Sequence, residues 1–247
     1  MKKYLLIPLF FLAIQVSAQQ QQTEGIVYYN YTQYWTKIIK RLTFLSKEEK
    51  DRSAMTWKNE DGYTQKMKLF FSPSQSLYSY NNDEIEGAGY SWRKDEYSIY
   101  RNFDQDKKFD VIEMLGKVYI VDDSLHTPKW KISNQIKDIA GFICMKATMD
   151  DPVRGQKITV WFAQDIPVGA GPERYFGLPG MILGIDMNEG DVIIEATKVE
   201  FKPVANELKQ PKAKGKKIKD SDYDTIISNH IKESMKASRN PFWAIRY

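Results

Sequence analysis

Short runs of β-forming residues with alternating polarity recur along most of this chain, and turn-forming residues separate them. In residues 65–71, for example, Met67, Leu69 and Phe71 share one side and lysines fall between them. A period of two residues is that of a β-strand with one protected face. The pattern therefore predicts a mainly β fold, and 247 residues suffice for one such domain with a sizeable core.

Neighbouring runs are joined by turn residues such as Gly116, the segment 150–155 and the segment 188–190. Glycine, proline, asparagine and aspartate are typical of tight turns. Consecutive hairpins predict an antiparallel sheet, because a parallel pair needs a crossover of about a dozen residues or more. Strands are expected at residues 25–32, 65–71, 76–80, 97–103, 111–114, 117–122, 129–133, 139–149, 156–162, 181–187 and 192–202.

Two segments near the C-terminus depart from the strand pattern. Residues 209–219 carry six lysines around Pro211 and Gly215, which is typical of a solvated linker. Residues 220–238 instead place apolar side chains three or four positions apart, which predicts an amphipathic helix. We expect an α+β fold of mainly β type, in which a curved antiparallel sheet of consecutive hairpins can form a half-barrel with this helix packed on it.

The first 18 residues have the pattern of a secretory signal peptide. Lys2 and Lys3 precede an apolar stretch, residues 4–14, and small residues at 16–18 predict cleavage before Gln19. Cleavage would lower the formal net charge from +4 to +2, which gives no reason to expect a nucleic-acid partner. No later apolar stretch approaches the roughly 20 residues of a spanning helix. We expect an exported chain with one β-rich domain, residues 19–247, and no transmembrane segment.

The chemistry-bearing residue types are few. Cys144 is the only cysteine, so no intramolecular disulfide can form, and its apolar surroundings favour a buried structural thiol. Met145 nearby leaves a soft-metal site open as an alternative. The only histidines are His126 and His230, and no local catalytic motif surrounds them. A hydrolase would need a site assembled from distant residues. No cofactor or metal is expected.

Two sequence blocks carry a resemblance to a known family. Residues 177–182 read Gly-Leu-Pro-Gly-Met-Ile, and residues 141–147 contain a glycine–aromatic–x–cysteine–x–lysine–alanine pattern. The chain resembles the GLPGLI family, secreted proteins of Bacteroidota whose biochemical role is not established. The motif residues, which we expect to serve architecture, are Gly141, Cys144, Lys146, Ala147, Gly171, Pro172, Gly177, Leu178, Pro179 and Gly180.

The Pro179-Gly180 pair predicts a type II turn, because proline fixes φ at the second position and glycine accepts a positive φ at the third. We expect the glycine-rich loop before it to fold over one end of the sheet. A glycine-rich loop can also cradle an anion, but no GxxxxGK[ST] pattern and no following helix support that alternative.

The resemblance implies an extracytoplasmic location, in the periplasm or at the outer-membrane periphery of a Gram-negative bacterium. It also implies a link to outer-membrane receptors, since genes of the family often lie near them. Trp57, Trp92 and Trp243 fall in or near predicted loops and termini, so they are the candidate contact residues. We expect a non-enzymatic carrier or accessory protein with an outer-membrane receptor or transporter, or an apolar or peptide ligand, as partner. The alternatives are a periplasmic hydrolase and a metal-handling protein using Cys144 and Met145.

Overall fold

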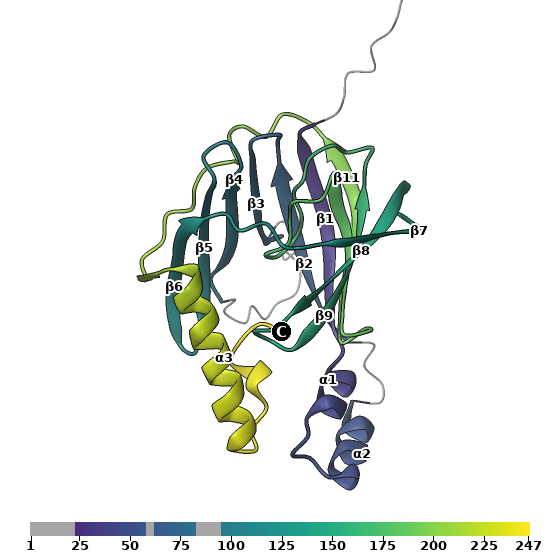
Figure 1. Ribbon diagram of the computed structural model, residues 1–247, viewed down its shortest axis with the longest axis vertical. Coiled ribbons are helices and arrows are strands. Elements are labelled where there is room, and N and C mark those ends of the chain that lie inside the picture. The colour runs from purple at the N-terminus through teal and green to yellow at the C-terminus, as the bar shows by residue number, and fades with distance from the viewer. Residues whose placement is uncertain (1–22, 58–61, 83–94) are drawn as a thin grey trace, which may run out of the picture.

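A computed structural model shows one open, strongly curved sheet (Figure 1). The structure describes residues 23–57, 62–82 and 95–247, so the expected signal peptide and Trp92 lie outside the described residues. The twelve strands run in the order β12-β6-β5-β4-β3-β2-β1-β11-β10-β9-β8-β7. They are β1 (Gly25–Gln33), β2 (Tyr63–Phe71), β3 (Gln75–Tyr80), β4 (Tyr97–Asn102), β5 (Lys107–Met114), β6 (Lys117–Ser124), β7 (Lys131–Ile139), β8 (Phe142–Asp151), β9 (Gln156–Ala163), β10 (Met181–Met187), β11 (Val192–Phe201) and β12 (Lys216–Ile218).

The mainly β, antiparallel prediction is confirmed, and most expected strands fall within a few residues of the observed ones. From β1 to β6 and from β7 to β11, each strand pairs antiparallel with its neighbour in sequence. The pairing of β1 with β11 joins these two series into one sheet. Segments of alternating polarity that follow each other in the sequence therefore form neighbouring strands of the sheet, as hairpin connections require.

The lysine-rich segment 209–219 is not linker throughout. Its end forms β12, which pairs in parallel with β6 at one edge of the sheet. Ile218, the one large apolar side chain among the lysines, is 8% exposed. Burial of that side chain explains why this stretch joins the sheet, which the charge pattern alone did not predict.

The expected C-terminal helix is α3 (Asp220–Lys236), which ends two residues before the predicted boundary. Tyr223, Ile227 and Ser234 are buried on it, and the other apolar residues of its stripe are partly buried. The 3-10 helix η1 (Pro241–Trp243) follows. From there the chain runs into the hollow of the sheet, where the C-terminus lies (Figure 1).

The helices α1 (Trp35–Arg41) and α2 (Lys47–Thr56) follow β1 and were not predicted. No residue of α2 is buried, so it lacks the apolar stripe by which helices are recognised. Its sequence signal is a capping box, in which Ser46 and Glu49 satisfy each other's backbone N–H groups. Across the described residues, no helix combines the length and the apolar character needed to cross a membrane.

The glycine-rich loop between β9 and β10 packs into the main core, where Ile166, Tyr175 and Leu178 are buried. The predicted type II turn is wrong. Gly180 does not take a positive φ, whereas Gly177 does, at 85°. The Gly180 N–H donates to the Leu178 carbonyl at 2.8 Å, which closes a three-residue turn around Pro179. Proline at the centre of such a turn already has the required φ, so a positive φ at Gly180 is unnecessary.

Candidate functional site

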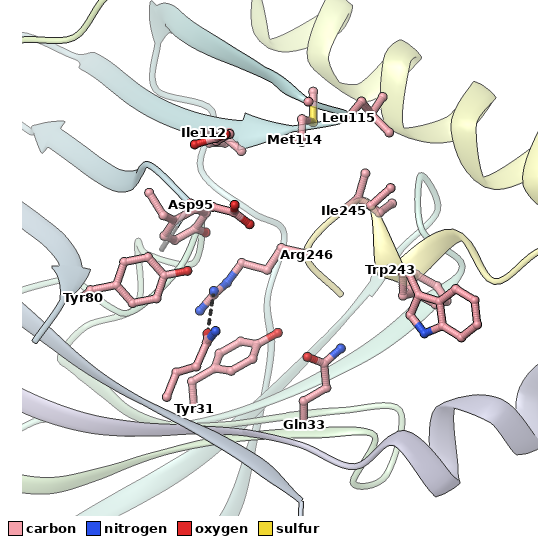
Figure 2. Close-up of a pocket in the computed structure, with 16 residues that line it drawn as sticks. Tyr31, Gln33, Tyr80, Asp95, Ile112, Met114, Leu115, Trp243, Ile245 and Arg246 are labelled. Carbon is pink, nitrogen blue, oxygen red and sulfur yellow. Dashed lines mark hydrogen bonds between the residues drawn. The ribbon is translucent and has the colours of Figure 1, made fainter. Parts of the chain in front are cut away.

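A pocket of about 400 Å³ opens inside the curved sheet (Figure 2). Among the described residues, its wall is formed by strands β1 to β5, Asp95, the turn after β5 and the C-terminal residues Phe242 to Arg246. Its volume lies in the range of about 300–1,000 Å³ that ligand sites occupy. We name it the Arg246 pocket, after the charged side chain at its inner end.

Alternation along β1 explains which side chains reach the pocket. Val27, Tyr29, Tyr31 and Gln33 occupy every second position and are all buried on the inner face. Val27, Tyr29 and Tyr31 belong to the main core, and Tyr31 and Gln33 also line the pocket. The C-terminal half of β1 therefore lies where the core meets the pocket.

Arg246 is held by Glu173 at the inner end. Its Nε lies 3.0 and 3.1 Å from the two Glu173 carboxylate oxygens, and Nη2 lies 2.8 Å from Oε1. Nη1 donates to Gln65 Oε1 at 3.1 Å. The guanidinium carbon is 3.9 Å from the ring centroid of Tyr31 and 4.4 Å from that of Tyr97. This is a bidentate ion pair with aromatic contacts, the arrangement in which arginine is most constrained.

The neighbouring tyrosines remain neutral phenols. Tyr97 donates a hydrogen bond to Glu173, and burial, with the nearby carboxylate, raises the pKa of Tyr97 well above its usual range. Burial likewise raises the pKa of Tyr31, against the opposing effect of Arg246. Both hydroxyl groups therefore keep their protons at physiological pH and can act as hydrogen-bond donors.

Two polar groups of the pocket have no partner within the described part of the chain. The Tyr31 hydroxyl is buried without a hydrogen bond. Gln33, 9% exposed, makes no side-chain hydrogen bond to the described residues, and its amide faces the pocket (Figure 2). Buried polar groups are normally paired, so these two require an explanation.

The pocket mouth carries an exposed aromatic side chain. Trp243, from η1, is 75% exposed and lines the rim near Gln33 (Figure 2). Asp95 and Tyr80 line the opposite wall. The sequence pointed to Trp243 as a contact residue, and the structure places it at this rim.

A second cleft, of about 270 Å³, lies where α3 meets the sheet. It is lined by three basic and three acidic side chains: Arg101, Lys108, Arg174, Asp151, Asp220 and Asp224. Lys108 lies 2.5 Å from Asp220, and Arg174 lies 3.1 Å from Asp224. In each pair the two charges neutralise each other. The ion pairs therefore attach α3 to β5 and to the glycine-rich loop.

The histidines do not form a hydrolytic site among the described residues. His126 is 3.9 Å from Asp220 at the mouth of the second cleft, beyond hydrogen-bonding distance, and its side chain is 70% exposed. Among the residues that the structure describes, no serine, threonine or cysteine lines that cleft. His230 Nε2 lies 3.0 Å from the Pro241 carbonyl oxygen, so this side chain connects α3 to η1.

The remaining predicted residues lie away from the Arg246 pocket. Trp57, half-buried at the end of α2, lines a separate small cavity. Cys144 is fully buried, and burial raises the pKa of its thiol to about 12. Pairing across β8 and β9 puts Met145 opposite Phe162 and Cys144 opposite Ala163, so the two sulfur atoms point to different faces. Within the described ranges, no group of three or more His, Cys, Asp or Glu side chains could hold a metal ion.

Several motif residues lie where other parts of the chain approach closely, whereas Gly141 has open space around it. Cβ atoms built on Gly171 and Gly180 would lie 2.7 Å from the Tyr175 carbonyl oxygen and 2.2 Å from that of Ala163. These glycines are needed because two backbone segments approach closely. Lys146 donates to Gln135 at 2.9 Å, and Ala147 is buried in the core.

Sequence reasoning missed Glu173 and Arg246. Glu173 has a positive φ of 58° in the glycine-rich loop, and Arg246 lies in an otherwise aromatic and apolar C-terminal segment. A charged residue within a glycine-rich loop or an apolar segment is a sequence signal for a buried ion pair. It does not show which residue is the partner.

Comparisons with known proteins address part of the chain and its fold. Residues 152–184 match a family described as "Protein of unknown function (Porph_ging)". This stretch contains β9, the glycine-rich loop and the first half of β10. No curated protein matches the sequence.

Solved structures of PNGF-II resemble this chain in fold. The structure in space group P21 has a TM-score of 0.55 at 14% identity, covering 83% of this chain and 33% of the other. The structure in space group C2 has a TM-score of 0.54 at 13% identity, with coverages of 83% and 32%. This chain therefore spans about a third of the PNGF-II chain, and the likeness supports the fold alone.

Proposed function

We propose that this chain is an exported, non-enzymatic binding protein of the bacterial cell envelope, which takes its ligand in the Arg246 pocket. The signal-peptide pattern supports export, and the GLPGLI-like motifs support membership of that secreted family. A carrier or accessory role in outer-membrane transport, with a receptor or transporter as partner, is the biological setting we propose for it.

The observation that carries this proposal is a pocket of about 400 Å³ that combines a polar group without a partner and an exposed aromatic rim. Gln33 lines it without a side-chain hydrogen bond to the described residues, and its amide faces the pocket (Figure 2). Trp243, which is 75% exposed, lies at the rim. Polar groups that fix orientation and exposed aromatic anchors are features by which pockets hold ligands.

Binding fits the pocket better than catalysis does. Glu173, the buried carboxylate, is committed to Arg246 and Tyr97. His126 and His230 are not among the lining residues. A general acid or base must lie within reach of the reacting group. Glu173 is already bonded to Arg246 and Tyr97, so it is not free to act as one at the inner end of the pocket.

Native mass spectrometry of the mature protein after incubation with an envelope extract tests the proposal. We expect a discrete added mass on the wild type and much less of it on Trp243→Ala. Met55→Ala is the matched control, because Met55 is also 75% exposed but lies on α2. Bare protein in every extract, or equal added mass on both variants, would contradict binding at this pocket.

The transport role has its own test. Immobilised mature protein should retain an outer-membrane receptor or transporter from the solubilised envelope, and retention should depend on the occupied pocket. If repeated pull-downs recover no membrane protein, the transport role is contradicted, while ligand binding by the pocket is not affected.

A further inference from the structure

Three exposed isoleucines gather on the hairpin of β7 and β8. Among the described residues, Ile132, Ile136 and Ile143 are half of the large hydrophobic side chains that are exposed, and each is more than half exposed. Ile132 pairs with Ala147 and Ile136 with Met145, so alternation along β8 places all three isoleucines on one face of the hairpin. Single exposed apolar side chains need no explanation, whereas a group on one face indicates a contact surface.

Strand β7 is also an open edge of the sheet. It stands last in the strand order and, in the described part of the chain, pairs with β8 alone (Figure 1). An edge strand presents a row of backbone N–H and C=O groups without partners. The opposite edge is β12, which has three residues, two of them lysines, and short strands and lysines are devices that protect an edge. With nine residues, β7 offers a longer ladder for a further strand.

A bulge divides β7 but preserves its two faces. The four steps from Ile132 to Ile136 correspond to two steps on β8, from Ala147 to Met145. The bulge therefore adds an even number of residues, so the two isoleucines stay on the same side. The pairing of residues 136–139 with β8 is regular, and this part of the edge is the one best suited to accept another strand.

The other face of the hairpin is basic. Lys131 and Lys137 lie there, because they pair with Thr148 and Cys144 on β8, and Lys146 lies between those two positions on the same face. The hairpin is therefore amphipathic across its thickness, with isoleucines on one side and lysines on the other.

The charge of this basic face is not balanced by the described residues. Lys137 Nζ lies 2.5 Å from a carboxylate oxygen of Glu195. Lys146 donates to the amide oxygen of Gln135 and lies 6.0 Å from the ring centroid of Trp161, and neither group carries a charge. The lysine at the first position of β7 forms no ion pair within the described ranges. A net positive charge thus remains on this face, and acidic side chains would complement it.

The charges also argue against a second copy of this chain as the occupant. Antiparallel pairing of two β7 strands about a two-fold axis normal to the sheet brings equivalent faces together, so lysines would gather on one side. Like charges on paired strands are destabilising. The one carboxylate of β7, Asp138, cannot relieve this, because it lies on the apolar face opposite Ile143.

We infer that β7 binds an extended segment of a partner protein in which apolar and acidic side chains alternate. The segment adds a strand along residues 136–139, with apolar side chains beside Ile136 and acidic ones on the side of the lysines. No residue of β7 or β8 is among the described residues that line the Arg246 pocket, so this surface is separate from the proposed ligand site.

NMR of the mature protein with synthetic peptides tests the inference. The probe is a peptide of about ten alternating valine and glutamate residues, the length of a long strand. One control replaces glutamate by lysine, and another has proline at the two central positions. We expect the probe to shift the β7 amide signals and both controls to bind at least about tenfold more weakly, because lysine reverses the charge and proline cannot complete the ladder.

Variants locate the binding. Lys131→Glu should weaken binding of the valine–glutamate peptide about fivefold and strengthen binding of the valine–lysine peptide, a reversal that unfolding cannot produce. Lys216→Glu changes an exposed lysine at the opposite edge and should alter neither affinity. Ile136→Thr keeps a β-branched side chain but shortens the apolar surface, so it should also weaken the probe about fivefold. Ile136 is 67% exposed, so urea denaturation of this variant should match the wild type.

Three other outcomes would overturn the inference. The first is hydrogen exchange of the β7 amides as slow as that of the central strand β1, which would show that the edge is already covered. The second is a dimer in sedimentation that Ile136→Thr abolishes, which would assign the edge to a second copy. The third is equal binding of the two charged peptides, or binding of none. The proposed ligand function is tested separately, through Trp243→Ala, and survives each of these results.

Discussion

Tyr31 and Tyr78 are two tyrosines of the core with the same uncommon property. Both are at most 1% exposed, and neither hydroxyl has a hydrogen-bond partner in the described residues. Burial raises the pKa of both phenols, so they remain protonated and uncharged. They differ in location, because Tyr31 lines the Arg246 pocket and Tyr78 does not. A comparison of the two tests whether the cost of an unpaired buried hydroxyl depends on a neighbouring pocket.

Replacement of either tyrosine by phenylalanine should stabilise the ligand-free protein. Each change removes an unpaired buried hydroxyl while keeping the ring, so the free energy of unfolding should rise by about 1–3 kcal/mol. Urea denaturation measures this. Tyr29→Phe is the control, since the Tyr29 hydroxyl donates to the Ile182 carbonyl at 2.7 Å and its loss should destabilise. Destabilisation of Tyr31→Phe to the same extent as Tyr29→Phe would contradict a missing partner.

At the scale of elements, the loop from β9 to β10 reaches the inner end of the pocket, and α3 docks on the sheet elsewhere. The loop brings Glu173 to Arg246, and its glycines allow close backbone approach. The first turn of α3 is fixed by Asp123, which accepts hydrogen bonds from the Asp220 backbone N–H at 3.0 Å and from Lys219 Nζ at 3.4 Å. The Glu173–Arg246 contact and the Asp123–Asp220 contact each involve only a few atoms, so single substitutions can test them.

Gly180→Ala should destabilise the protein more than Gly141→Ala, although both glycines belong to the family-like motifs. A Cβ on Gly180 would lie 2.2 Å from the Ala163 carbonyl oxygen, and backbone there cannot move away cheaply. We expect a loss of about 3 kcal/mol or more. Gly141 has a φ of +82° but open space around it, so its loss should be about 1–2 kcal/mol. Equal thermal shifts for the two variants would contradict this account.

The docking of α3 should weaken in acid. The hydrogen bond from the Asp220 backbone N–H lowers the pKa of Asp123 below its usual value, against a smaller opposing effect of burial. A folded-state pKa below the unfolded one gives stability that is present above about pH 4 and is lost as the pH falls through the folded value. Amide exchange in α3, followed from about pH 6 to about pH 3, should show this loss after correction for intrinsic rates. Asp123→Asn should flatten the dependence.

At the scale of the whole molecule, the C-terminal residues connect parts of the sheet that are distant in sequence. Arg246 contacts Gln65 on β2 and Glu173 in the loop after β9. Tyr247 donates a hydrogen bond to Asp191 and accepts one from Asn188 at 2.7 Å, between β10 and β11. The C-terminal segment therefore contributes to the core and also forms one wall of the Arg246 pocket.

Arg246→Met should destabilise the protein by about 3–5 kcal/mol, because it leaves Glu173 buried without its cation. Glu173→Gln should also destabilise, and the double variant should lose less than the sum of the single changes. Chemical denaturation of the four proteins gives this coupling energy. Strictly additive losses would show that the two side chains do not act as a pair.

The sequence alone determined the strands and their antiparallel pairing, because polarity alternation and turn residues are local features of the chain. It also located α3 and placed Trp243 among the contact candidates. Local patterns failed for α2, which has no buried stripe, for β12, which rests on a single isoleucine, and for the Pro179-Gly180 turn. A capping box decided the first, burial of Ile218 against the rest of the fold decided the second, and a local hydrogen bond around Pro179 decided the third.

Only the tertiary structure decided the candidate site. Arg246 and Glu173 are 73 positions apart, and Arg246 and Gln65 are 181 positions apart. No periodicity relates residues at such separations. They meet because a twelve-stranded sheet curves around its own C-terminal segment, so the order of the strands and the curvature of the sheet determine which side chains share the pocket.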